Sequence, residues 1–343
     1  MHHLIEHPLQ SFTTATVLPA ALRAELEQLG DSTLTLVDSL NAPDGTTKLL
    51  LRCRDDSHIE TVIMRYRRRI TLCVSSQVGC PVGCAFCATG AMGFRRNLTT
   101  AEIVDQVRVA AHVLSVEGRR PSNVVFMGMG EPLLNLQAVL NAIELLTNPA
   151  GLGLAHRAIA VSTVGIPAGI RRLARVQPQI HLALSLHAPD ERVRAQLVPP
   201  KFRHSIPEIL AAADEHFALT HRKLFVEYVL MAGINDSPEQ ARKLAILLKG
   251  RVVTVNLLAW NEVPELRAAG RQTFPSSSAP LAAPSAFTRD KVLGGRIIRL
   301  RPPSPSAIAR FRDILLAAGV ETVVRASKGE SIRAACGQLA GRQ

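Results

Sequence analysis

The sequence lacks long apolar runs, its first residues lack the pattern expected of a signal peptide, and it contains few cysteines. No stretch approaches the roughly 18 consecutive apolar residues of a transmembrane helix, and the opening residues, MHHLIEHPLQ, lack the basic and then apolar segments of a signal peptide. These absences predict a cytoplasmic protein with no membrane partner. Six cysteines, unevenly placed in 343 residues, exclude a disulfide framework, so clustered cysteines here indicate metal binding or redox chemistry.

Acidic residues are also scarce relative to basic ones. The chain has 40 Lys and Arg residues against 28 Asp and Glu residues, a formal net charge of +12, and most of the cations are Arg. The planar guanidinium group suits phosphate, so a polyanionic partner is one explanation. A coding bias towards Arg, spread over a solvated surface, is the other. Charge alone therefore does not decide the function.

Apolar residues are plentiful and regularly patterned. They make up 47% of the chain, which excludes wholesale disorder and is enough for one large domain or two smaller ones. From residue 70 onward, short β-branched runs alternate with helical patterns, as in βαβ units. About six such repeats, with no GxGxxG turn after any strand, predict an α/β fold that is a complete or partial (β/α) barrel. The expected strands are 70–76, 123–127, 158–163, 180–187, 223–231, 252–260 and 321–326.

Capping signals and composition define the expected elements and domains. One helix is expected at 19–29, and residues 265–298 interrupt the pattern with a Ser/Pro/Ala-rich piece that is typical of a surface insertion or flexible loop. We therefore expect a short N-terminal extension at 1–59 and a barrel domain at 60–343. The helix signals are Thr99 with Glu102 and Ser237-Pro238 with Gln240, both capping-box patterns, and Ser304-Pro305 with a closing Gly319.

The strongest local signal is a cluster of three cysteines. Cys80, Cys84 and Cys87 lie on one short loop after an expected strand, with Gly79 and Gly83 allowing a tight backbone path. A structural zinc site or a closed iron–sulfur cluster needs four ligands. Three cysteines instead leave one iron of a [4Fe–4S] cluster open to an external ligand.

With Phe86 before the last cysteine, this CxxxCxxC motif resembles that of the radical S-adenosylmethionine (radical SAM) superfamily. The resemblance implies a barrel of the radical SAM type and a [4Fe–4S] cluster on Cys80, Cys84 and Cys87. The open iron would bind the amino and carboxylate groups of S-adenosyl-L-methionine (SAM), and an electron from the cluster would cleave SAM to a 5′-deoxyadenosyl radical. An external electron donor such as flavodoxin or ferredoxin is then a further expected partner.

Longer motifs resemble the RlmN/Cfr-type RNA (adenine-C) methyltransferases within that superfamily. LCVSSQVGCPVGCAFCATGAMGFRRNL surrounds the cysteines, and GMGEPLLN at 128–135 matches the loop after the second strand. The resemblance implies that Gly130 and Glu131 bind the ammonium group of SAM. The other implied SAM contacts fall at strand ends, where barrel enzymes place ligands; they are Ser162, Ser185, Leu186, His187 and Asn256.

Two further cysteines and one glutamate match catalytic positions of the same family. Cys336, in ASKGESIRAACGQL, matches the cysteine that becomes S-methylated, and Cys73 matches the second catalytic cysteine. Glu60 matches the proposed general base. Cys53 has no counterpart, so we expect it to be a buried structural residue.

The implied reaction adds a methyl group to C2 or C8 of an adenine. Both carbons are electron-poor, so simple displacement on SAM is not available to them. By resemblance, one SAM methylates Cys336, a radical from a second SAM removes a hydrogen from that methyl group, and the methylene radical adds to adenine. Glu60 would deprotonate the adduct, and Cys73 would attack Cys336 to release the product and leave a disulfide.

The implied RNA is ribosomal, with 23S rRNA first and tRNA second. The segment Arg65-Tyr66-Arg67-Arg68-Arg69 and the pair Arg95-Arg96 flank the expected chemistry and are candidate phosphate contacts. The target adenine must be unpaired or leave its stack to reach Cys336.

Two departures from the family pattern leave the substrate open. The region before Glu60 is short for the RNA-gripping N-terminal domain of the family, and 265–298 is an apparent insertion. A radical SAM enzyme of the same architecture on another RNA or a non-RNA substrate therefore stays an alternative. Methylthiolation would need a second set of cluster cysteines, and only Cys53 is unassigned. A non-catalytic iron–sulfur or RNA-binding module would predict losses among the motif residues, which are all present.

Overall fold

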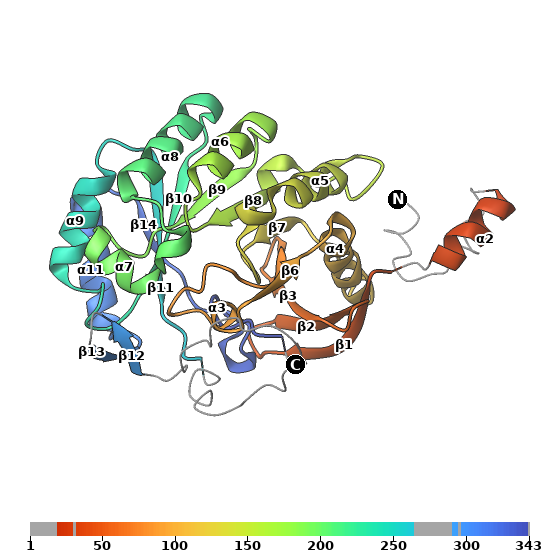
Figure 1. Ribbon diagram of the computed structural model, residues 1–343, viewed down its shortest axis with the longest axis horizontal. Coiled ribbons are helices and arrows are strands. Elements are labelled where there is room, and N and C mark those ends of the chain that lie inside the picture. Colours follow the sequence, from red (N-terminus) through yellow and green to blue (C-terminus); the bar gives the residue numbers. More distant parts are fainter. Residues whose placement is uncertain (1–18, 30–31, 264–289, 294–295, 342–343) are drawn as a thin grey trace.

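The computed structural model describes residues 19–29, 32–263, 290–293 and 296–341, and is built around one curved sheet (Figure 1). This 10-stranded sheet has the order β1-β2-β3-β4-β7-β8-β9-β10-β11-β14. Its members are β1 (Leu34–Asn41), β2 (Thr46–Cys53), β3 (His58–Arg65), β4 (Ile70–Cys73), β7 (Asn123–Phe126), β8 (Ile159–Thr163), β9 (His181–Ser185), β10 (Leu224–Leu230), β11 (Val253–Ala259) and β14 (Thr322–Val324). Two separate hairpins pair β5 (Gln77–Gly79) with β6 (Phe94–Asn97) and β12 (Asp290–Leu293) with β13 (Arg296–Arg299).

The N-terminal helix lies apart from the curved sheet, and most of the other helices run along its outside (Figure 1). They bury one apolar face against the strands, as Val107, Val139, Ile170 and Leu244 show by their full burial in the main core. The helices are α2 (Ala20–Leu29), α3 (Ala88–Ala91), α4 (Thr100–Ser115), α5 (Leu136–Thr147), α6 (Pro167–Val176), α7 (Glu191–Leu197), α8 (Ile206–Thr220), α9 (Pro238–Leu248) and α11 (Pro305–Ala317). Short 3₁₀ turns are η2 (Pro132–Asn135), η3 (His156–Ala158), η4 (Pro200–Phe202) and η5 (Glu330–Ile332).

The strand directions make the sheet a partial barrel. The strands from β4 to β14 are parallel, so their carboxyl ends meet at one edge. In the part of the chain that the structure describes, the sheet ends at β1 and β14, which do not pair with each other. The predicted α/β barrel is therefore confirmed, in its partial form.

The seven expected strands are all present, but three more precede them. β4, β7, β8, β9, β10, β11 and β14 lie within the predicted runs. β1, β2 and β3 were not predicted; they extend the sheet as consecutive antiparallel neighbours, and β3 pairs with β4. β2 is buried along nearly its whole length, including Lys48, so it lacks the alternation that marks a strand with one wet face.

The helix signals are confirmed with one correction. Thr99 and Glu102 form a reciprocal capping box, and Ser304 accepts a hydrogen bond from the Ala307 amide. Ser237 caps α9 through the Gln240 amide, but the Gln240 side chain donates to Asp190 Oδ2 at 3.2 Å instead of closing a box. The Gln240 amide nitrogen thus has a carboxylate acceptor, whereas Gln240 Oε1, which would accept from the Ser237 amide in a capping box, is buried without a hydrogen-bond partner among the described residues.

The division of the chain at residues 59 and 60 stays a prediction. That position lies within β3, whose neighbour β2 belongs to the expected N-terminal extension. Of the expected insertion at 265–298, residues 265–289 and 294–295 lie outside the described residues.

Candidate active site

The three-cysteine loop connects β5 to α3. Cys80, Cys84 and Cys87 are all partly buried, at the edge of a second apolar cluster. Gly79, with φ +71°, has the Gly93 carbonyl oxygen 1.8 Å from where a Cβ would stand, so any other residue would push the β5–β6 hairpin apart. The loop therefore depends on glycine next to its first cysteine.

The loop suits a positively charged iron–sulfur group. Burial, and then the negative charges of Cys87 and Glu131, raises the pKa of Cys80 to about 12. Burial and the same kind of repulsion, from Cys87 and then Cys80, raise the pKa of Cys84. Among the described residues, no three His, Cys, Asp or Glu side chains converge on a single ion position. Three thiolates on one loop are the donor set of a [4Fe–4S] cluster, in which each cysteine binds a different iron.

Gly130 and Glu131 lie beside this loop. Gly130, with φ +100°, packs so closely on Gln77 that a Cβ would lie 2.6 Å from the Gln77 side chain. Glu131 is buried, and its carboxylate accepts from the amides of Leu133 at 3.0 Å and Val164 at 2.7 Å. Burial raises the pKa of Glu131 to about 7 despite these two bonds. A carboxylate has about four acceptor sites, so this one can still accept from an ammonium group.

Of the other expected SAM contacts, Ser162 and Ser185 lie at the ends of their strands, whereas Asn256 lies in the middle of β11 and not at a strand end as expected. Ser162 and Ser185, on the neighbouring strands β8 and β9, have their hydroxyl oxygens 3.1 Å apart. Asn256 on β11 donates to Glu227 Oε1 on β10 at 2.7 Å. Leu186 has no exposed surface and its side chain belongs to the main core, so only its backbone is available to a ligand.

His187 is an uncharged, rigid residue in this site. It adopts φ +58°, its Nδ1 accepts from the Val229 amide at 3.2 Å, and its ring meets the Phe86 ring edge-on at 4.7 Å. Burial, and then the charge of Arg194, lowers the pKa of His187 to about 3. His187 therefore supports Phe86 in the cysteine loop and stays uncharged near neutral pH.

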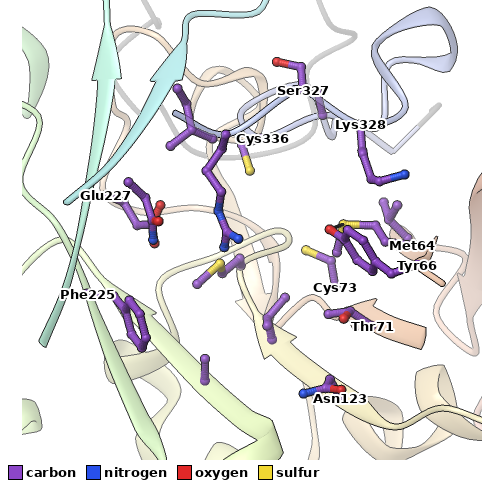
Figure 2. A pocket seen from close by; sticks show the side chains of 18 of the residues that line it. Met64, Tyr66, Thr71, Cys73, Asn123, Phe225, Glu227, Ser327, Lys328 and Cys336 are labelled. Carbon is purple, nitrogen blue, oxygen red and sulfur yellow. Dashed lines mark hydrogen bonds between the residues drawn. The ribbon is translucent and has the colours of Figure 1, made fainter. Parts of the chain in front are cut away.

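A cavity of about 440 Å³ lies in the concave side of the sheet, and both Cys73 and Cys336 line it (Figure 2). Cys73 ends β4, and its thiol is buried; burial, and then the charge of Cys336, raises its pKa. Cys336 has accessible surface and faces the cavity. Many protein atoms still surround its thiol, and this local burial raises the pKa of Cys336 to about 11. Two cysteines that are far apart in the sequence thus face one space, and both are free thiols here.

Residues 333–340, which we call the Cys336 segment, are held by contacts from several elements. The Gly337 carbonyl accepts from the Ala88 amide at 2.7 Å, which joins this segment to α3 directly behind the cysteine loop. The Cys336 carbonyl accepts from Asn261 Nδ2 at 3.3 Å, and the Leu339 carbonyl accepts from Thr89 Oγ1 at 2.6 Å. These bonds keep Cys336 at the border between the cysteine loop and the cavity.

Glu60 lies near this segment but is not among the residues that line the cavity. It is buried in β3, where Oε1 pairs with Lys48 Nζ at 2.9 Å and Oε2 accepts from the Ala340 amide at 2.9 Å. Lys48 also donates to the Arg333 carbonyl at 3.2 Å. In this arrangement, Glu60 and Lys48 together hold the two ends of the Cys336 segment.

Some of the candidate RNA-binding arginines form ion pairs with carboxylates of the protein, and others are exposed. Arg65 forms an ion pair with Glu117, and Arg96 binds Asp55 at 2.7 Å and Glu102 at 2.8 Å. These two arginines therefore have structural partners. Arg67, Arg68, Arg69 and Arg95 are exposed. Cys53 is buried, as expected of a structural cysteine, and burial, followed by the charge of Glu102, raises its pKa to about 12.

Sequence reasoning missed three charged residues around the cysteines. Glu227 lines the cavity and its charge raises the pKa of Cys336, whereas Arg325, also in the lining, lowers it. Lys48 is the partner of Glu60. A signal existed for Glu227 and Lys48, since each is a charged residue inside an otherwise apolar run, LFVEYVL or TTKLLL.

Comparisons with known proteins agree with this site. Residues 74–245 match the family model of the Radical SAM superfamily, whose members use a [4Fe–4S] cluster and SAM, so the cofactor prediction is confirmed. A probable dual-specificity RNA methyltransferase RlmN of Thermus thermophilus is 41% identical over 99% of this chain and 87% of that protein. The ribosomal RNA large subunit methyltransferase N of Nitrosopumilus maritimus is 40% identical over 94% of this chain and 85% of that protein.

A solved structure gives the same assignment. The crystal structure of a radical SAM methyltransferase from Sphaerobacter thermophilus is 41% identical, covers 99% of this chain and 91% of its own, and superposes with a TM-score of 0.86. The extent of these matches leaves no large part of the fold unaccounted for. The chain therefore belongs to the RlmN family of radical SAM methyltransferases.

Proposed function

We propose that the protein methylates C2 or C8 of an adenine in RNA, through an S-methyl group on Cys336. The observation that carries this proposal is that Cys336 and Cys73 line one cavity, with Cys336 next to the three-cysteine loop. The names of the relatives support RNA as the substrate class, and one of them names large-subunit ribosomal RNA. We propose ribosomal RNA first and tRNA second.

The residues around the loop fit the family cofactors. Cys80, Cys84 and Cys87 would hold the cluster, and Gly130, Glu131 and the other expected contacts would hold SAM. When bound, this pair supplies a carbon-centred radical that can remove a hydrogen atom from a methyl group. The role of Glu131 is to accept hydrogen bonds from the SAM ammonium group, and the roles of Ser162, Ser185, His187 and Asn256 are to shape and orient the rest of the site.

Cys336 and Cys73 divide the methyl transfer between them. The Cys336 sulfur would take a methyl group from the sulfonium of SAM by displacement, with S-adenosylhomocysteine as the leaving group and loss of the thiol proton. After that group has lost a hydrogen atom, its carbon bonds to the adenine. The adduct then gives the proton of the adenine carbon to a base and one electron to an oxidant, a role that the [4Fe–4S] group held by Cys80, Cys84 and Cys87 would supply. The Cys73 thiolate then attacks the Cys336 sulfur, the carbon–sulfur bond breaks, and the released carbon takes a proton to become methyl. Two electrons from an external reductant restore both thiols from the disulfide.

The cavity has the charge expected for a nucleic-acid substrate. Four cations line it, and Glu227 is its one lining carboxylate among the described residues. Such an excess attracts phosphate and would bring the target nucleotide towards the cysteines. The cations are Arg69, Arg157, Arg325 and Lys328.

Glu60 is our candidate for the base that deprotonates the adduct. Because its two oxygens contact Lys48 and Ala340, it would need a shift of the Cys336 segment to reach the adenine. Flavodoxin or ferredoxin is the proposed electron donor. The described part of the chain contains no helix long and apolar enough to cross a membrane, which is compatible with the proposed cytoplasmic location.

The test uses anaerobic protein with a reconstituted cluster, methyl-labelled SAM and total RNA from a strain that lacks such enzymes. Label is mapped by mass spectrometry. Wild type is expected to label an adenine carbon, Cys336→Ala to give no label, and Cys73→Ala to accumulate a covalent protein–RNA adduct because the carbon–sulfur bond is not broken.

Cys53→Ala is the matched control, since Cys53 is a buried cysteine away from the cavity, and it should label RNA like wild type. SAM cleavage without labelled RNA in the wild type would contradict an RNA substrate and favour the same radical chemistry on another molecule.

A further inference from the structure

Two cations share one aromatic ring in the lining of the cavity. The Arg69 guanidinium carbon lies 4.6 Å from the centroid of the Tyr66 ring, and Lys328 Nζ lies 5.0 Å from the same centroid. All three residues line the cavity that Cys73 and Cys336 also line. Figure 2 shows Tyr66 and Lys328 side by side, with Tyr66 next to Cys73. We call Tyr66, Arg69 and Lys328 the ring-and-cation group.

The backbone fixes Tyr66 and Arg69 relative to each other. They close the turn between β3 and β4, where the Tyr66 amide donates to the Arg69 carbonyl at 2.9 Å. The same turn leads through β4 directly to Cys73. The position of Arg69 over the ring is therefore tied to the strand that ends in a catalytic cysteine.

Lys328 is fixed from the other side, by the segment that leads to Cys336. Its Nζ donates to the Asp44 carbonyl at 3.2 Å, and the next amide, Gly329, donates to Asp44 Oδ2 at 2.9 Å. Gly329 has φ +68°, and a Cβ there would lie 2.7 Å from the Ala334 Cβ. This tight contact places Lys328 at one defined point against the β1–β2 turn.

Both cations keep hydrogen-bond donors for a ligand. Among the described residues, Arg69 has no ion pair and no side-chain hydrogen bond to a protein acceptor. Lys328 uses one of its three donors on the Asp44 carbonyl. The Asp44 carboxylate accepts from the amides of Thr46 and Gly329 and, among the described residues, forms no ion pair with Lys328. A guanidinium group can stack on a ring and still present its edge to an anion.

We propose that the ring-and-cation group binds a phosphodiester of the RNA next to the target adenine. The proposal rests on the proposed function and adds the residues that set the register of the RNA. Arg69 and Lys328 supply charge-assisted hydrogen bonds to the phosphate oxygens, and the Tyr66 ring holds the two cations at a fixed spacing. Because both cations already lie against the ring, Tyr66 acts as a spacer and not as a stacking surface for a base.

The position of the ring-and-cation group predicts which step of the reaction the phosphate contact affects. Arg69 lies in the turn before β4, the strand that ends at Cys73, and Lys328 lies just before the Cys336 segment. A phosphate held between them places the adjoining base in the cavity that both cysteines face. The contact is therefore expected to affect methyl transfer to RNA, and not the methylation of Cys336 itself, which needs no RNA.

The test compares two double variants that remove the same charges. Arg69→Gln/Lys328→Gln removes the cations of the group. Arg242→Gln/Lys249→Gln removes one Arg and one Lys from exposed positions on and just after α9, away from the cavity. Methyl transfer to deproteinised large-subunit rRNA is measured as kcat/KM at several KCl concentrations, and Cys336 methylation is measured separately by protein mass.

The cavity double variant should lower kcat/KM for rRNA by roughly tenfold or more, from the loss of two charge-assisted contacts. The slope of log(kcat/KM) against log[KCl] should become shallower by about 0.7 to 0.9, the value of one phosphate contact. The outer double variant should change neither quantity, and Cys336 should be methylated equally in both. Tyr66→Phe should resemble wild type, and Tyr66→Leu should lose activity towards rRNA.

Three results would overturn the inference. Equal losses in the two double variants would show a general charge effect, and unchanged transfer in the cavity variant would show no contact at all. A loss of Cys336 methylation in the cavity variant would show a disturbed active site. A wild type that methylates Cys336 and cleaves SAM but labels no RNA would contradict the proposed function as well, so the two failures are distinguishable.

Discussion

At the scale of single residues, buried charge holds the Cys336 segment in place. Lys48 and Glu60 form an ion pair with side-chain exposures of only 10% and 4%, and each also bonds to the backbone of that segment. Removing two charges from water is unfavourable unless each finds good partners. Here the partners are the two ends of the loop that presents Cys336, so the pair links stability to the site.

Removing only one charge of the Lys48–Glu60 pair should lower the free energy of unfolding more than removing both charges. Lys48→Met leaves the buried Glu60 carboxylate uncompensated and should lower the free energy of unfolding by about 3 to 5 kcal/mol. Lys48→Met/Glu60→Gln should be more stable than Lys48→Met alone, as measured by the midpoint of urea unfolding. If the double variant lost the sum of the two single losses, the two residues would not be coupled.

At the scale of elements, α8 shows how a buried polar group makes stability depend on pH. His216 is 1% exposed, its Nδ1 lies 3.3 Å from the Thr220 hydroxyl, and its Nε2 is buried without a hydrogen-bond partner. Burial lowers the pKa of His216 from 6.5 to about 4. The folded protein therefore resists protonation of a ring that the unfolded chain protonates readily.

The lowered pKa of His216 predicts that the folded protein becomes less stable as the pH falls. Between pH 6.5 and about 4 the unfolded state binds more protons at this residue, so the stability that is fully present above pH 6.5 is lost as the pH falls. One such group changes the free energy of unfolding by at most about 1.4 kcal/mol per pH unit.

His216→Leu should remove this contribution, because leucine suits the apolar surroundings of α8 and does not titrate. Urea midpoints of wild type and variant should diverge as the pH is lowered from 8 to 5, in favour of the variant. Parallel curves over this range would show that His216 does not contribute to acid sensitivity.

At the scale of the whole molecule, positive charge and the cavity act together. The net charge is +12, and the lining of the cavity is itself cationic, with one carboxylate among its described residues. Several surface arginines are neutralised by ion pairs, such as Arg171 with Glu215 and Arg251 with Asp214. The positive field is therefore less uniform than the composition suggests, and the cavity is one of the places where it is concentrated.

RNA binding should accordingly be strongly dependent on salt. Each neutralised phosphate contributes about 0.7 to 0.9 to the slope of log K against log[salt], so the affinity for rRNA should fall steeply between 50 and 200 mM KCl. Fluorescence anisotropy with labelled rRNA fragments measures this, and equilibrium dialysis of SAM with the reconstituted protein is the control, since SAM has no phosphate. A flat salt dependence for RNA would contradict a phosphate-led interface.

Local patterns in the sequence determined the seven parallel strands, the caps at Thr99 and Ser304 and the three-cysteine loop, because each depends on residues that are close together in the chain. The antiparallel strands β1 to β3 could not be predicted in this way, because none of them alternates regularly between buried and exposed residues: β2 and most of β3 are buried throughout, and β1 is mostly exposed. Family resemblance supplied Cys336 and Cys73 as a pair, although nothing in their spacing relates residue 73 to residue 336.

Only the tertiary structure decided what surrounds these residues. It brought Lys48 to Glu60, Glu227 to Asn256 and Lys328 to Tyr66, contacts between elements that are separate in the chain. It also showed that Arg65 and Arg96 already have carboxylate partners. The physical reason is that secondary structure and capping follow from local backbone and side-chain preferences, whereas the ionic state and availability of a side chain depend on neighbours that the folded sheet selects.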